Sequence, residues 1–164
     1  MTSWSWFVRN LIVIYCRNVK DMMPRYNEKY HLIYGVLDEY FEDPEVIGEF
    51  SRIDFRVFQE VQSDMPELMN DYDYMKQIIR IRPCAFMITK SDKMGFEKYV
   101  DLAVLTMECD PYMYVNLPFI LKNEEKVSLA AIKNDSENYL NFLYSYWQRG
   151  LTEHIKEVLI ASII

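Results

Sequence analysis

The sequence has little glycine, histidine and cysteine. Its 164 residues include only 4 Gly, 2 His and 3 Cys. With so few glycines the chain has little material for tight hairpin turns, β-bulges or glycine-rich phosphate loops. The patterns G-x-x-x-x-G-K-[ST], G-x-G-x-x-G and G-x-S-x-G are all missing, which disfavours nucleotide-dependent and α/β-hydrolase chemistry.

The few histidines and cysteines give weak support to a metal site. His31 and His154 form no His-x-x-His pair, and Cys16, Cys84 and Cys109 form no C-x-x-C pair. Because the cysteines are odd in number and widely spaced, we predict small buried thiols in a reducing, cytoplasmic compartment, with no disulfide framework and no cofactor. An enzyme that pairs Cys84 or Cys109 with His31 stays open, since such sites assemble in space.

Long apolar runs are also missing near the start of the chain. Arg9 and Asn10 interrupt the apolar residues there, and only 11–16 is continuous. A membrane-spanning helix needs about 20 apolar residues. We therefore expect no signal peptide and no transmembrane segment.

Charge of one sign predominates. Asp and Glu number 25 against 18 Lys and Arg, giving a formal net charge of -7. A general nucleic-acid binder usually has the opposite balance. The acidic surface therefore either keeps the chain soluble or meets a protein partner.

Helical periodicity dominates what is present. A stripe at three- and four-residue spacing runs through the first helix, which Ser3 caps, and we expect it to face the core. Its members are Trp4, Phe7, Val8, Leu11, Ile12, Tyr15 and Val19. The alternative is that Trp4, Trp6 and Phe7 anchor the helix to a membrane interface or a partner.

Capping residues and prolines predict the later helices. An Asp43-Pro44 start predicts a helix over 45–51, and Ser91-Asp92 and Asn123 are expected to cap helices over 96–108 and 124–133. Other expected helices cover 27–41, 54–62, 66–69, 72–82, 85–88, 111–121, 136–147 and 153–164. Because the turns are short, we predict a single all-α domain over residues 1–164.

A small-residue apolar motif recurs in this pattern. Aligning its copies places Ile79, Val104, Ile132 and Ile163 in register, at spacings of about 25, 28 and 31 residues. Ala103, Ala130, Ala131 and Ala161 are expected to allow close helix packing. The predicted fold is irregular helical-pair repeats, as a short α-solenoid or a compact bundle, over residues 65–164, with residues 1–64 as an N-terminal helical cap.

One stretch carries a family resemblance. The run Asp110-Pro111, Leu117-Pro118, Leu121-Lys-Asn123 and Leu129-Ala-Ala-Ile-Lys133 resembles an uncharacterised α-helical repeat family, a domain of unknown function. That family occurs in giant viruses, protists and intracellular bacteria. The resemblance covers about residues 65–164 and implies a helical scaffold with a viral or host-facing source. It implies no catalytic residue.

Two groups of side chains are candidates for partner binding. The first is an acidic run in which Arg52 is the one opposing charge within residues 38–54; its candidate residues are Glu42, Asp43, Glu45 and Glu49. The run lacks the alternating Asp and Asn ligands and the central glycine of a calcium-binding loop. A solvated face with charges at helix N-termini is the simpler interpretation. The second group is aromatic, because tyrosine is abundant at 13 residues. Its candidates are Tyr139, Tyr146 and Trp147 near the C-terminal end, and Tyr112, Tyr114 and Tyr144 also lie on helix faces. Covering a thin helical core explains these aromatic residues equally well.

A basic cluster gives weak support to nucleic-acid binding instead. Lys76, Arg80, Arg82, Lys90 and Lys93 lie near Tyr72 and Tyr74, a combination that would suit single-stranded nucleic acid. A solvated face, with its charges balanced elsewhere, is the simpler interpretation.

Together these features favour a non-enzymatic α-helical protein–protein interaction module, viral or host-directed. The alternative is a small acidic inhibitor or immunity-type protein that blocks a basic site. An enzyme with a Cys/His site ranks below both, and self-association is open.

Overall fold

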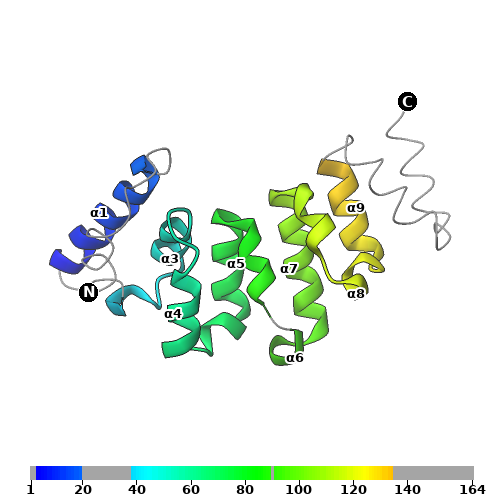
Figure 1. Cartoon of the computed structure of the whole chain (residues 1–164), viewed down its shortest axis with the longest axis horizontal. Coiled ribbons are helices and arrows are strands. Elements are labelled where there is room, and N and C mark those ends of the chain that lie inside the picture. The colour runs from blue at the N-terminus through cyan, green and yellow to red at the C-terminus, as the bar shows by residue number, and fades with distance from the viewer. Residues whose placement is uncertain (1–2, 20–37, 90, 135–164) are drawn as a thin grey trace. The chain divides into compact units, whose positions relative to one another are not determined.

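The computed structural model describes residues 3–19, 38–89 and 91–134. Within these ranges every regular element is a helix and no strand is present (Figure 1), which confirms the predicted all-α class. None of the described helices is long and apolar enough to cross a membrane.

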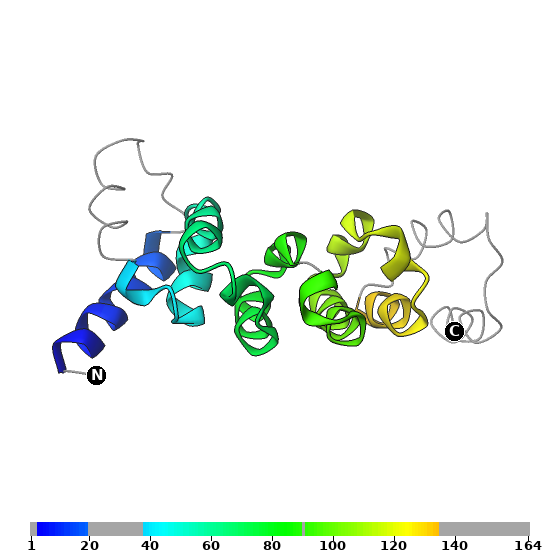
Figure 2. The same ribbon diagram turned by 90° about the horizontal axis from the view of Figure 1, so that it is seen from below.

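The chain divides into two compact units, residues 1–89 and residues 90–164. The first contains α1 (Ser3–Val19), η1 (Asp38–Tyr40), α3 (Pro44–Ser51), α4 (Val57–Asp64), η2 (Leu68–Asn70), α5 (Tyr72–Ile81) and η3 (Pro83–Ile88). The boundary expected at residues 64 and 65 falls inside this unit, between α4 and η2, which contact each other. Helix α3 lies between α1 and α5 (Figures 1 and 2).

Helix α3 begins as its sequence predicts. The Asp43 carboxylate accepts hydrogen bonds from the backbone N–H groups of Glu45 and Val46, and Pro44 fills the first turn. Its apolar residues Val46, Ile47 and Phe50 are fully buried. A Cβ at Gly48 would lie 2.8 Å from Ile81 Cδ1, so glycine permits the close approach of α3 to α5.

The described part of α1 is oriented differently from our expectation. Phe7, Leu11 and Tyr15, expected in the core, are exposed, whereas Val13 and Cys16 are buried. The helix is apolar on more than one face, and periodicity alone does not show which face meets the fold.

The start of α4 also differs from the prediction. The buried Asp54 carboxylate accepts from the backbone N–H and guanidinium of Arg56, which makes a turn in place of a first helical turn. The helix therefore begins at Val57, and Phe55, expected to face inward, is exposed and stacks edge-on against Phe58.

The second unit contains α6 (Ser91–Met94), α7 (Phe96–Cys109), η4 (Pro111–Asn116), α8 (Phe119–Lys122) and α9 (Glu125–Asn134). Helix α7 packs against α9. Ala103 and Ala131 are fully buried, and Ala130 is 9% exposed. Their burial agrees with the expected use of small residues for close packing.

Two expected caps in this unit are wrong. Ser91 and Asp92 start the separate turn α6, and the residue that precedes α7 is Gly95, at φ 87° and ψ 145°. Asn123 does not cap α9, since it has helical dihedrals and ends α8.

Local structure recurs at an offset of 28 residues. The helix η3 starts at Pro83 and η4 at Pro111, while α6 starts at Ser91 and α8 at Phe119. The predicted offset between Val104 and Ile132 is the same. The recurrence is one of local structure, and membership of a repeat family stays a prediction.

Several predicted elements lie outside the described residues. These are the helix residues 27–37, the helices over 136–147 and 153–164, the candidates Tyr139, Tyr146 and Trp147, and both histidines.

Candidate protein-binding surfaces

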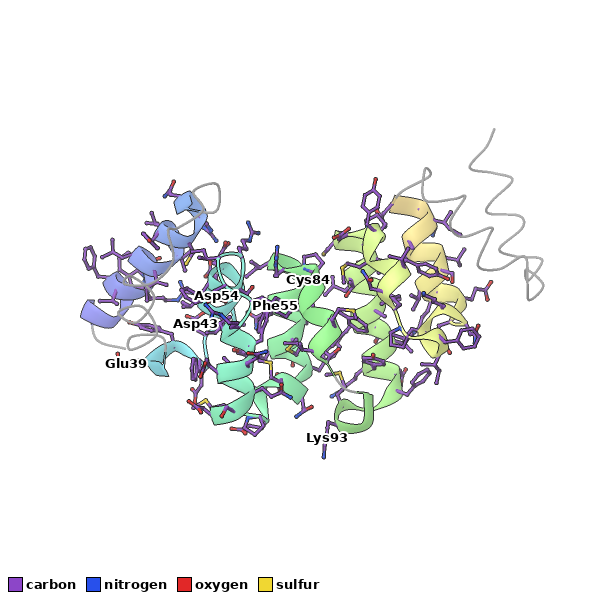
Figure 3. The ribbon with its side chains drawn as sticks, viewed as in Figure 1. Glu39, Asp43, Asp54, Phe55, Cys84 and Lys93 are labelled. Carbon is purple, nitrogen blue, oxygen red and sulfur yellow. The ribbon has the colours of Figure 1, made fainter. Side chains whose placement is uncertain are left out.

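The predicted acidic residues converge on α1 through two arginines. Arg9 donates to both Asp43 oxygens and to Glu45 Oε2, joining the middle of α1 to the start of α3. Figure 3 shows Asp43 at this end of α3. These hydrogen bonds, first to Asp43 and then to Glu45, hold the pKa of Arg9 above its usual range.

The network continues along α3. Arg17 lies 3.0 Å from Glu45 Oε1 and 2.9 Å from Glu49 Oε1. The other Glu49 oxygen lies 3.3 Å from Arg52 Nε. The Glu49 side chain is only 5% exposed, so its charge is compensated by arginines from two elements.

The acidic run is therefore less available than its sequence indicates. Asp43, Glu45 and Glu49 each contact an arginine of α1. A basic partner would have to compete with Arg9 and Arg17 for them. Glu42 is exposed, as is Glu39 on η1 (Figure 3), and the Glu45 side chain is 39% exposed although it is paired with Arg9 and Arg17. Partner binding at all four candidate residues stays a prediction.

The three cysteines occupy different environments. Cys16 is buried, Cys84 is intermediate and Cys109 is exposed, so the expectation of three buried thiols is wrong for Cys109. Burial, and then the charge of Glu49, raise the pKa of the Cys16 thiol to about 12. Among the described residues no group of three His, Cys, Asp or Glu side chains could hold a metal ion.

The predicted basic cluster is divided between the two units. Lys76 lies over the Tyr72 ring, with its amino nitrogen 5.3 Å from the ring centroid. Arg80 is exposed and Arg82 intermediate, while Lys93 belongs to the second unit and Lys90 lies outside the described residues. Tyr74 is buried and donates a hydrogen bond to the Phe41 carbonyl, so it is not available to stack on a base.

Exposed apolar side chains gather at two places. The first place is formed by η4 and α8. Its exposed side chains are between 52% and 63% exposed and belong to Tyr112, Val115, Phe119 and Ile120. We name these four residues the η4–α8 patch. Residues three apart on a 3₁₀-helix share one face, so Tyr112 and Val115 point the same way.

Polar contacts connect the two short helices of this patch to each other and to α9. The Lys122 amino group donates to the Val115 carbonyl at 2.8 Å and lies over the Tyr114 ring. The buried Tyr114 hydroxyl lies 3.3 Å from Ser128 Oγ on α9. Since Lys122 ends α8, these contacts connect α8, η4 and α9.

The second gathering lies on α1. Phe7, Leu11 and Ile14 are 50%, 50% and 55% exposed, and we name them the α1 outer row. Trp6 and Tyr15 flank it.

Sequence reasoning identified these surfaces only in part. The sequence placed Tyr112 and Tyr114 on helix faces without deciding which is exposed; Tyr112 is exposed and Tyr114 is buried. The sequence did not identify Val115, Phe119 and Ile120 as exposed. We expected one helix over 111–121, whereas the structure has two helices separated at Leu117 and Pro118. The available signal was the Leu117-Pro118 step, because a residue that precedes proline disfavours the helical conformation.

Comparison with known proteins adds no function. No model of a protein family, no curated protein and no solved structure matches the chain.

Proposed function

We propose that this chain is a non-enzymatic helical module that binds another protein through the η4–α8 patch. The observation that carries the proposal is the concentration of four large apolar side chains, each more than half exposed, within nine residues. Contiguous exposed apolar surface marks interaction sites in soluble proteins, and tyrosine and phenylalanine are enriched where proteins meet.

Hydrogen bonds around the patch support a binding role. Its short helices are bound to α9 and to each other through Tyr114, Lys122 and Ser128. A surface that is already ordered loses little conformational entropy when a partner docks. The partner chemistry that fits is an apolar helix or groove with few charges at its centre.

Two features of the sequence support a setting for this activity. The resemblance to a helical repeat family of giant viruses and intracellular bacteria supports a host protein as the partner. The widely spaced cysteines support a reducing compartment, the cytoplasm of the host.

The test begins with photocrosslinking from the patch. A benzoylphenylalanine placed at Tyr112 or Phe119, in the full chain within its native cells, is expected to capture the same protein from both positions. Phe96 is the matched control, because it is an exposed aromatic of the same unit outside the patch, at 42%.

Affinity with the purified partner then decides the proposal. Replacing both Phe119 and Ile120 with Glu should weaken binding at least about tenfold, because charge replaces apolar contact at the interface centre. Ile14→Glu, on α1, should leave the affinity unchanged. Capture from Phe96 equal to that from Tyr112, or an unchanged affinity of the double variant, would contradict the proposal.

A further inference from the structure

Helix α1 meets α3 through few apolar side chains. Among the described side chains of α1 only Val13 and Cys16 are buried, and both are small. Val8 and Ile12 are half-buried, and the other apolar side chains described on this helix are exposed. Hydrophobic stabilisation scales with the apolar area removed from water, so the apolar part of the contact between α1 and α3 is limited.

Arginines supply the polar part of the same contact. Arg9 bonds to Asp43 and Glu45, and Arg17 lies 3.0 Å from Glu45 Oε1 and 2.9 Å from Glu49 Oε1. The Arg17 and Glu45 side chains are 53% and 39% exposed, so dissolved ions reach them and screen their attraction. The contact between α1 and α3 thus depends on a force that salt weakens.

Helix α3 is anchored to the rest of its unit in a different way. It packs against α5, where Gly48 permits a close approach to Ile81, and its Ile47 and Phe50 are fully buried. Apolar burial carries no charge for salt to screen. The cap of α3, Asp43, belongs to its own sequence, so the helix keeps its start and its packing on α5 without α1.

We propose that α1 is a latch held by charge, which separates from α3 by local unfolding while α3 and α5 stay packed, and so controls access to the acidic face of α3. Single elements of a fold can open at a lower free energy than the whole. Separation removes Arg17 from between Glu45 and Glu49, which are neighbours four residues apart on one helix face. These carboxylates then face solvent. The proposal is independent of the η4–α8 patch.

Salt should act in opposite directions on α1 and on the rest of the fold. The chain has a formal net charge of -7, and salt screens the self-repulsion of an acidic chain, which does not destabilise the fold as a whole. The attraction between α1 and α3 is screened by the same ions. A loss of protection that is confined to α1 therefore reports the ion pairs and not general unfolding.

Hydrogen exchange of the full chain, read by mass spectrometry of its peptides, tests the proposal. An isolated helix of this length is marginal in water, so amides of residues 3–19 lose protection when α1 separates. Their exchange should be at least about fivefold faster in about 1 M than in about 0.05 M NaCl, since exposed ion pairs contribute about 0.2–1 kcal/mol each. Exchange of residues 72–81, in α5, should not accelerate.

A variant with its matched control assigns the effect to the arginine. Arg17→Gln should accelerate exchange of residues 3–19 at low salt and reduce its dependence on salt, because part of the screened attraction is already removed. Lys126→Gln is the control, since Lys126 is 51% exposed and lies 2.9 Å from Asp101 in the second unit, and should leave this exchange unchanged. Arg17→Lys keeps the charge without the guanidinium fork and should fall between wild type and Arg17→Gln.

Each other outcome counts against the latch. Exchange of residues 3–19 that does not respond to salt overturns it, and so does acceleration of residues 72–81 by the same factor, because α1 would then open only with its whole unit. An equal effect of Arg17→Gln and Lys126→Gln would also overturn it. Circular dichroism checks that the variants are folded.

Discussion

At the residue scale, the charged side chains of α3 show how a sequence window misleads. Within residues 38–54 only Arg52 opposes the acidic run. Folding brings Arg9 to Asp43 and Arg17 to Glu49, across 34 and 32 residues of sequence. Ion pairs between elements depend on which helices pack together, and local composition does not contain that information.

The Glu49 network should contribute measurably to stability. Glu49→Gln should lower the free energy of unfolding by about 1–2 kcal/mol, because Arg17 and Arg52 lose a buried counter-charge. This loss is smaller than for a fully buried ion pair, because the Arg17 side chain is 53% exposed and solvent screens its charge. Urea denaturation measures it. The control Glu42→Gln, on an exposed carboxylate, should change stability by less than about 0.5 kcal/mol, and equal effects at both positions would refute the network.

The cysteines should differ in reactivity. The thiolate is the reactive form, and burial with a pKa of about 12 keeps Cys16 protonated. Iodoacetamide on the native protein should therefore modify the exposed Cys109 first, Cys84 more slowly and Cys16 only on unfolding. Peptide mass spectrometry over time distinguishes them, and rapid native labelling of Cys16 would contradict its placement against α3.

Burial of Cys16 also makes the free energy of unfolding depend on pH. Because its folded pKa is raised from 9.0, the fold favours the protonated thiol. That contribution to the free energy of unfolding is complete below about pH 9 and is lost as pH rises toward about 12.

At the element scale, α3 and α5, which start at an Asp cap, begin within one residue of the predicted positions. Asp43 and Asp71 each accept from the first backbone N–H groups of their helices, α3 and α5, and a side-chain cap depends only on neighbouring residues. The errors occur where the backbone turns without such a cap. Gly95 precedes α7 through its positive φ, and Asp54 delays α4 through its contacts with Arg56.

The Gly95 turn gives a test of this account. A Cβ there would meet nothing within 4 Å, so Gly95→Ala costs only backbone strain at φ 87°. We expect a loss of about 1–3 kcal/mol in the free energy of unfolding. Lys93→Ala, on an exposed side chain of the preceding turn, should cost less than about 0.5 kcal/mol. Thermal and urea unfolding of both variants provide the comparison, which fails if Gly95→Ala is neutral.

At the scale of the whole molecule, the all-α class predicted from the sequence is confirmed, but the sequence did not predict which surfaces stay exposed. The acidic candidates Asp43, Glu45 and Glu49 join two helices of the fold. The apolar residues Leu11 and Phe119, in contrast, face solvent. An apolar side chain is expected in the core by default, so its exposure becomes visible only when the packing of its helix is known.

We propose that the η4–α8 patch binds a protein. The most direct measurement is the affinity of the photocrosslinked partner, once purified, for the wild-type chain and for the variant with Glu at both 119 and 120. We expect a dissociation constant at least about tenfold higher for the variant, with Ile14→Glu indistinguishable from wild type. Equal affinity for the variant and the wild-type chain would contradict it.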